Sequence, residues 1–240
     1  MEAEFAGEFE THLTVRLGTE AGAMDASARL EHRAGRTGLK LTRIVLDRGP
    51  MPDQPMLTET GRGALTERRA AALLRSAELR AAGFPVIRVK IEASPRNADI
   101  LQTADEAAAL SPVCHFEHHI KLLLPGEPEV AMARAVAERH SAHLSRNARR
   151  AAREGRHERF VTQRCRTVGR PEARARLDAL LGALTAATGG WTATRTGCGS
   201  GWRRRSQPCW NGQPRGDGPD RPRAVDTTTA LTHAGSGGLP

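Results

Sequence analysis

The chain has 240 residues, of which 39% are hydrophobic, 26% are charged and 3% are aromatic, and its formal net charge is +9. Such values predict a globular protein of one or two domains, whose core consists mainly of leucine, valine, isoleucine and alanine. No stretch approaches the ~20 apolar residues of a membrane span, the N-terminus lacks the basic and apolar regions of a signal peptide, and the four cysteines show no CxxC spacing, so we expect a cytoplasmic protein without a membrane partner.

The first half of the chain predicts strands and helices in alternation. Residues 9–17 alternate apolar and polar side chains with the period of a strand, and residues 39–47 are expected to form a second strand. A short helix is predicted over 25–34 between them. Residues 48–63 contain three prolines and three glycines, which favours a loop. Residues 64–82 predict a strong helix, and Gly83 stands where a helix C-terminus requires a glycine.

The second half continues the alternation until about residue 188. A β-branched stretch at 85–93 and an alternating stretch at 115–124 predict the third and fourth strands. A helical turn is expected near 104–110. The remaining predicted elements are a helix over 129–143, a strand over 156–165 and a helix over 171–184.

This order of elements predicts an α+β fold. Hairpin and crossover connections are mixed, which favours a largely antiparallel sheet with helices on one face. A ferredoxin-like arrangement, possibly duplicated, accounts best for the order. A doubly wound parallel sheet fits less well, because the strands alternate with polar residues.

We divide the chain into an α+β domain, 1–188, and a tail, 189–240. The tail holds eleven glycines and five prolines but few branched apolar residues. Such a composition favours disorder. The abrupt change at residue 188 also suggests a shifted reading frame. A duplicated fold requires one more strand after the last helix, and none is evident in the tail.

Alternation assigns polar side chains from three strands to one open face of the sheet. If the helices cover the apolar sides, this face is cationic and carries two histidines, a combination suited to phosphate or carboxylate. The net charge likewise favours anionic partners, although only three of the 36 basic residues are lysines and arginine abundance alone is a weak indication of nucleic-acid binding. The face collects His12, Thr14, Arg16, Arg88, Lys90, Glu117, His119 and Lys121.

Two of these strands carry a histidine followed two positions later by a polar residue: His12-Leu13-Thr14 and His119-Ile120-Lys121. The chain thereby resembles the two-histidine phosphoesterases, which include RNA 2′,3′-cyclic phosphodiesterases and RNA ligase-like proteins. That family carries two His-x-Thr/Ser motifs on paired strands of a duplicated sheet. Lys121 departs from the second motif. The chain also resembles a group of uncharacterised actinobacterial proteins with ETHLTV, IVLDRG and FEHHxKLLL segments, from which no activity transfers.

The resemblance implies a hydrolase that needs no cofactor. His12 and His119 would act as general base and general acid in an unassigned order, with Thr14 and Lys121 orienting the phosphate. Arg16, Arg88, Lys90 and Glu117 would contact a substrate that contains phosphate, such as a nucleotide or an RNA end. The positive charge of Lys121 would also be able to lower the pKa of His119.

Three other interpretations stay open. The same basic face suits a module that binds anions or nucleic acid without catalysis. A metal site is conceivable from His115, His118, His119 and Glu117, or from His140 and His143 on one predicted helix. The arginine-rich stretch 146–159 is expected to be either a solvated helix face or a contact for a nucleic-acid backbone. The 48–63 loop is long enough to form a lid over the face, where Asp53, Gln54, Thr58 and Arg62 would contact a ligand.

Overall fold

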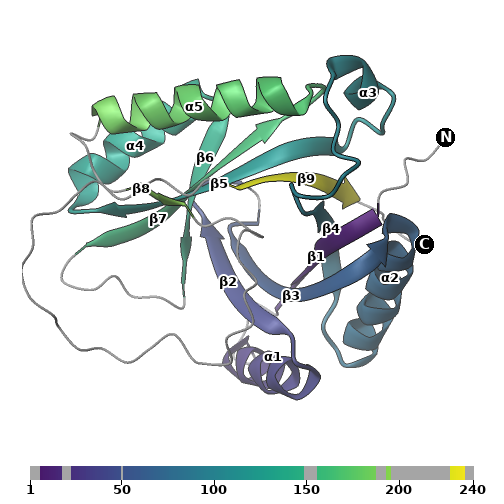
Figure 1. Ribbon diagram of the computed structural model, residues 1–240. Helices are drawn as coiled ribbons and strands as arrows, with labels where there is room; N and C mark the ends of the chain where they lie inside the picture. Colours follow the sequence, from purple (N-terminus) through teal and green to yellow (C-terminus); the bar gives the residue numbers. More distant parts are fainter. Residues whose placement is uncertain are drawn as a thin grey trace, which may run out of the picture.

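The computed structural model describes residues 6–17, 23–49, 51–148, 156–187, 193–195 and 228–235 (Figure 1). In chain order the elements are β1 (Ala6–Val15), α1 (Ala23–Thr37), β2 (Lys40–Leu46), β3 (Asp53–Ala64), α2 (Leu65–Ala81), β4 (Val86–Ala93), α3 (Ala104–Ala108), β5 (Cys114–Leu124), α4 (Glu127–Arg139), β6 (Ala142–Asn147), β7 (His157–Cys165), α5 (Arg170–Ala187), β8 (Ala193–Arg195) and β9 (Thr228–Gly235).

All strands belong to one antiparallel sheet that closes on itself. Successive neighbours in the ring are β1, β3, β2, β6, β7, β5, β9 and β4, and β4 pairs again with β1. The short β8 pairs with β5 beside β9. The prediction of an α+β fold with a largely antiparallel sheet is therefore confirmed. The sheet is closed into a ring, however, so its polar face is an interior and not an open surface.

The two halves of the chain repeat the same arrangement. In the first half, the sheet order is β4-β1-β3-β2, and in the second half it is β9-β5-β7-β6. Each half runs strand, helix, two strands, helix, strand, which places β1 opposite β5 as equivalent central strands. The halves meet where β2 pairs with β6 and where β4 pairs with β9. This repetition is what a duplicated fold requires, and the ferredoxin-like name for each half stays a prediction.

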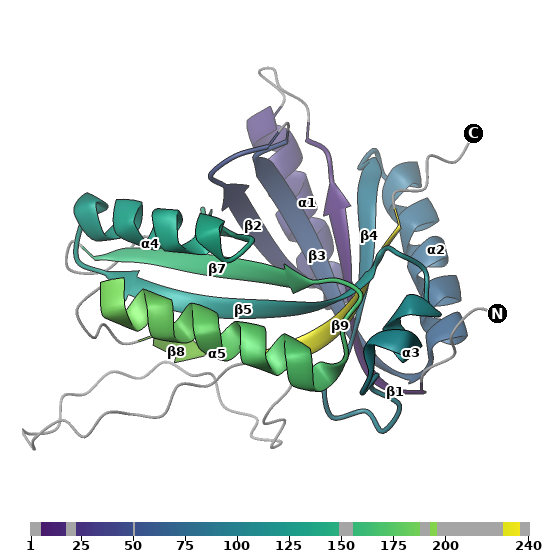
Figure 2. The same cartoon turned by 90° about the horizontal axis from the view of Figure 1, so that it is seen from above.

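The apolar core lies between the outside of the ring and the helices. Seen from above, α4 and α5 lie along β5 and β7, whereas α1 and α2 lie along the strands of the first half (Figure 2). Leu13 of β1 packs with Leu30 of α1, and Ile120 of β5 packs in the cluster that holds Leu180 of α5. Alternation then turns the polar residues of the same strands toward the inside of the ring.

Two predicted boundaries are wrong. Residues 53–64 of the expected loop form β3, a strand with partners on both sides. Leu57 is the only leucine of β3 and is deeply buried, so the apolar period of this strand is weak. Pro55 pairs with β2 only, because the pairing of β3 with β1 ends before it. The helix expected over 129–143 ends at Arg139, and β6 follows from Ala142. In β3, Pro55 is tolerated because β1 has no residue paired with it that would need its missing N–H.

Other predictions agree with the structure. Strands β1, β2, β4, β5 and β7 and helices α2 and α5 overlap their predicted ranges. Gly83 has φ of +83°, the left-handed conformation expected after the end of α2. The tail is an exception: no strand was evident in its sequence, but the backbones of β8 and β9 pair with strands of the ring. Residues 188–192, 196–227 and 236–240 lie outside the described residues. The prediction of disorder falls mostly on these residues. Among the described helices, none has the length and apolar character needed to cross a membrane.

Candidate functional site

The polar inner sides of β1, β4 and β5 form one buried cluster of charged residues. His12 on β1 lies opposite Lys90 on β4 and opposite Thr58 on β3. Two positions along β4, Glu92 points to the same side as Lys90. Since the ring brings β5 close to both strands, Glu117 and His119 join these residues. All five ionisable groups lie inside the sheet, whose strands fix their positions.

His12 is held by contacts at both ring nitrogens. Its Nδ1 lies 2.9 Å from the hydroxyl of Thr58, while its Nε2 lies 3.3 Å from Oε1 of Glu92 and 3.7 Å from Oε2 of Glu10. The residue is only 6% exposed. The hydroxyl therefore orients the ring, and Nε2 is directed toward carboxylates in the centre of the cluster.

His119 repeats this geometry in the second half. Its Nδ1 lies 3.2 Å from the hydroxyl of Thr162 on β7, and its Nε2 lies 3.1 Å from Oε1 of Glu117. The same Nε2 is 4.0 Å from Oε1 of Glu92, the oxygen that also faces His12. Because β1 corresponds to β5 and β3 to β7, each half supplies one histidine oriented by one threonine. The two imidazoles thus point at a shared carboxylate oxygen.

Lys90 neutralises the two carboxylates at the centre. Its Nζ lies 2.8 Å from Oε1 of Glu117 and also contacts Oε1 of Glu92. Burial alone would raise the pKa of both carboxyl groups, but the charge of Lys90 and the nearby histidines holds these pKa values well below the usual range. In turn, burial would lower the pKa of Lys90, but the two carboxylates raise it. All three groups are therefore charged at neutral pH.

The pKa of His119 is raised to about 9. Burial would lower it, but hydrogen bonds to Glu117 and Glu92 stabilise the protonated ring. The expected lowering by Lys121 does not occur, because Lys121 forms an ion pair of 2.6 Å with Glu158 on β7. His119 is consequently an imidazolium at neutral pH, and its side chain is 26% exposed, compared with 8% for His12.

The structure brings four of the eight predicted site residues into one cluster. His12, Lys90, Glu117 and His119 form the cluster, and the buried Thr14 lies opposite Arg88 on the next strand. Arg16 follows the end of β1, after a register shift at Thr14, and is exposed. Lys121 is turned to Glu158.

Several residues of the cluster were missing from the predicted site. Glu92 falls on the polar face of its strand by alternation, but a lone glutamate gave no reason to select it. The Oγ1 contact of Thr58 places this residue in the site as a partner of His12, although it was expected in a lid. Thr162, Arg164 and His115 also belong to the cluster, through contacts with His119 and Glu117. Alternation along 157–165 would have marked Thr162 and Arg164 as neighbours.

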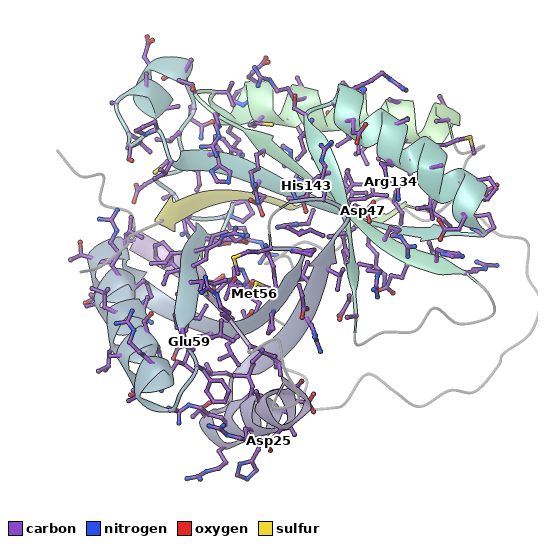
Figure 3. All side chains as sticks on the ribbon, turned by 180° about the vertical axis from the view of Figure 1, so that it is seen from behind. Asp25, Asp47, Met56, Glu59, Arg134 and His143 are labelled. Atoms are coloured by element: carbon purple, nitrogen blue, oxygen red, sulfur yellow. The ribbon has the colours of Figure 1, made fainter. Side chains whose placement is uncertain are left out.

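The inner and outer faces of β3 show how the pleat sorts side chains. Met56 and Glu59 point to opposite sides of the strand, and Glu59 lies toward α2, where Arg75 contacts it at 3.3 Å (Figure 3). Among the described residues, the histidines considered as an alternative metal site do not gather in one place. His118 is turned to the core side, where its Nδ1 meets Gln163, while His140 caps α4 and His143 belongs to β6. Of the arginine-rich stretch, Arg146 lies in β6 and Arg159 in β7, whereas 149–155 lie outside the described residues.

The cluster contains donor sets that suit a metal ion. The donor atoms of Glu92, Glu117 and His119 lie within 4.8 Å of one another, as do those of Glu10, His12 and Glu92. Imidazole with carboxylate suits zinc or iron. Lys90, however, already places its ammonium against the two central carboxylates. This lysine supplies the positive charge that the carboxylates need.

No protein-family model and no curated protein matches this chain. The chemistry of the site must therefore be inferred from its own geometry. Two histidines face one centre, one of them is protonated at neutral pH, and each has its second ring nitrogen fixed by a hydroxyl. Such an arrangement is suited to the transfer of protons between two positions a few ångströms apart.

Proposed function

We propose that this protein is an enzyme that cleaves a phosphate ester by general acid–base catalysis, with His12 and His119 as the proton-transferring residues. The observation that supports the proposal most directly is the shared target of the two rings: Nε2 of His12 and Nε2 of His119 lie 3.3 and 4.0 Å from the same oxygen of Glu92. The substrate would be a nucleotide or an RNA end.

The environments of the two histidines suggest their order. With a pKa of about 9, His119 carries a proton at neutral pH and is suited to donate it to the leaving oxygen as the general acid. His12 then acts as the general base toward the attacking hydroxyl or water. The hydroxyls of Thr58 and Thr162 orient the rings from the opposite side.

The resemblance to two-histidine phosphoesterases agrees with this proposal in part. Both histidines lie on equivalent strands of a repeated arrangement, as in that family. At the second motif, Lys121 takes the place of the hydroxyl residue and is paired with Glu158. Two carboxylates, Glu92 and Glu117, also stand where a phosphate would approach the rings. Cations outside the motif are therefore needed to hold the phosphate.

Turnover by the full chain tests the proposal. We expect hydrolysis of 2′,3′-cyclic nucleotides, and we expect His12→Gln and His119→Gln each to lower kcat/KM by about 10²- to 10⁴-fold. His32→Gln, an exposed substitution on α1, is the matched control and leaves turnover unchanged. Urea unfolding of each variant verifies that the fold persists.

Two outcomes contradict the proposal. Turnover that survives both site substitutions would exclude these histidines from the chemistry. Turnover that stops with a chelator and returns with zinc or manganese would instead favour the donor set of Glu92, Glu117 and His119 as a metal site. Binding of the nucleotide without any product would support a module that recognises anions.

A further inference from the structure

Arg88 is a cation of the inner face that pairs directly with no carboxylate among the described residues. It lies two positions before Lys90 on β4 and opposite Thr14 on β1, so alternation directs it to the same side as the cluster. The residue is half-buried. Within the described part of the chain its guanidinium forms neither a hydrogen bond nor an ion pair. Because desolvating a charge is costly, an unpaired guanidinium in this position calls for a partner.

A second guanidinium, that of Arg164, joins the same cluster through Glu117, which also contacts Lys90. Arg164 faces Glu117 across β5 and β7, and its Nε lies 2.8 Å from Oε2 of Glu117. Its two terminal nitrogens have no hydrogen-bond partner among the described residues, and the side chain is 34% exposed. Burial and the charge of Arg164 lower the pKa of Arg88, and the opposing attraction of Glu117 and Glu92 does not outweigh them.

The two central acidic residues attract Arg88 but make their direct contacts with other cationic or imidazole groups. Glu117 already contacts Lys90, His119 and Arg164, and Glu92 contacts Lys90 and His12. Arg88 is therefore left without a direct carboxylate contact among the described residues. Burial and the charge of Arg164 lower the pKa of His143 to about 4, so this histidine adds no positive charge at neutral pH.

We propose that Arg88 and Arg164 form a subsite for a tetrahedral oxyanion, the phosphoryl group of the substrate, beside Glu117 and His119. This inference rests on the proposed function for the identity of the ligand, and it names residues whose positive charge offsets the nearby carboxylates. Guanidinium groups form paired hydrogen bonds with phosphate oxygens, and two of them offer more donors than one carboxylate accepts.

Binding of inorganic phosphate to the full chain tests the subsite. At constant ionic strength, titration calorimetry is expected to show saturable binding, and Arg88→Gln and Arg164→Gln are each expected to raise the Kd at least tenfold. Arg36→Gln is the matched control, because this arginine is exposed in the last turn of α1, outside the ring, and it leaves the Kd unchanged. An equal Kd in wild type and Arg88→Gln, or an adventitious effect of salt that sodium chloride reproduces, would overturn the subsite.

A second measurement separates ligand binding from a structural role. Without phosphate, Arg88→Gln removes repulsion from Arg164, so its urea midpoint is expected to equal or exceed that of the wild type. A clear loss of stability would instead assign Arg88 a structural role. If Arg88→Gln does not fold, Arg88→Lys keeps the charge but loses the planar fork, and we then expect a several-fold higher Kd.

The two proposals fail in different ways. If phosphate binding depends on Arg88 but no cyclic nucleotide is hydrolysed, the subsite stands and the enzymatic proposal falls. If hydrolysis depends on His12 and His119 while Arg88→Gln changes neither KM nor phosphate binding, the enzymatic proposal stands and the subsite falls. His119→Gln should abolish turnover and keep phosphate binding within a few-fold of the wild type.

Discussion

At the scale of single residues, the site depends on a balance of buried charges. Glu92 and Glu117 are 2% and 1% exposed, and both face Lys90, which is 6% exposed. A buried ion pair contributes little compared with apolar packing, but removal of one partner leaves the other charge without compensation. Lys90, Glu92 and Glu117 therefore set the electrostatic environment of the histidines and also determine the stability of the interior.

Replacement of Lys90 tests this balance. Lys90→Met is expected to lower the free energy of unfolding by ~3–5 kcal/mol, because two buried carboxylates lose their cation. Urea denaturation measures the change, and Lys40→Met, an exposed substitution on β2, should change it by less than ~0.5 kcal/mol. The double variant Lys90→Met with Glu117→Gln should recover part of the loss. A change below ~1 kcal/mol in Lys90→Met would contradict the role of this lysine.

The protonation of His119 predicts how stability depends on pH. Its folded-state pKa of about 9 lies above the ordinary value of 6.5, so its ion pairs stabilise the fold fully below pH 6.5, and this contribution disappears as the pH rises through about 9. We expect a loss of ~3 kcal/mol over that window from this group. Urea unfolding at several pH values measures the slope. His119→Gln should unfold with a flatter dependence, and an identical slope would exclude this assignment.

Acid conditions involve a different histidine. His118 is fully buried, its Nδ1 meets Gln163, and its Nε2 has no hydrogen-bond partner among the described residues. Burial lowers its pKa to about 4. Stability from the neutral ring is therefore present above pH 6.5 and is lost as the pH falls through about 4. A His118→Phe variant should lose less stability than the wild type between pH 6.5 and 4, as followed by urea unfolding.

At the scale of elements, the strand period predicted more of the site than any motif did. Alternation in β1, β4 and β5 correctly assigned His12, Lys90 and His119 to one face. It failed in β3, where apolar and polar residues do not alternate clearly and where the proline and the two glycines are typical of a loop. It also failed in β6, which follows α4 so closely that the sequence reads as one helix.

Long-range pairing explains what the sequence left open. The approach of His12 and His119 depends on the seams between the halves, β2 with β6 and β4 with β9. No local pattern encodes which strand edges meet, so neither ring closure nor the shared contact with Glu92 was predictable. The raised pKa of His119 follows first from Glu117 on the same strand and then from Glu92, whereas the sequence analysis considered only a lowering by Lys121.

The link from β7 to α5 offers a test of packing between elements. Gly169 is buried, and a Cβ at this position would overlap the backbone carbonyl of Gln102 in the segment before α3. We expect Gly169→Ala to cost ~1–3 kcal/mol in the free energy of unfolding, since a backbone neighbour cannot move aside cheaply. Gly182→Ala, in exposed α5 with open space around it, should stabilise the helix by ~0.5–1 kcal/mol. Equal effects of both substitutions would refute the close approach.

At the scale of the whole molecule, the two halves are joined by strands at both seams, by the buried cluster and by ion pairs at the surface. Arg134 of α4 donates to Asp47, just after β2, at 2.9 Å, and these residues lie side by side next to His143 (Figure 3). Both partners are partly exposed, so the pair contributes little to stability. The strand pairings and the buried cluster therefore carry most of the connection between the halves.

Removal of the C-terminal strand tests this connection. A chain ending at residue 188 lacks β9, and the edges of β4 and β5 lose their shared partner. We expect the truncated chain to unfold at lower urea concentration and to associate through its open edges, which light scattering detects. The full chain in the same buffer is the reference. Superimposable unfolding curves would show that the ring does not need β9, in agreement with a domain limited to residues 1–188.

Closure by β9 also has a consequence for the order of events during folding. The first half can pair β1 with β3 and β4 from neighbouring segments, but the contacts of Lys90 with Glu117 wait until distant strands converge. Until then, Lys90 lacks its contact with Glu117, and the edges of β4 and β5 lack their shared partner β9. Slow folding and transient association through the open edges are the expected consequences of burying these charges inside a ring of strands that closes late.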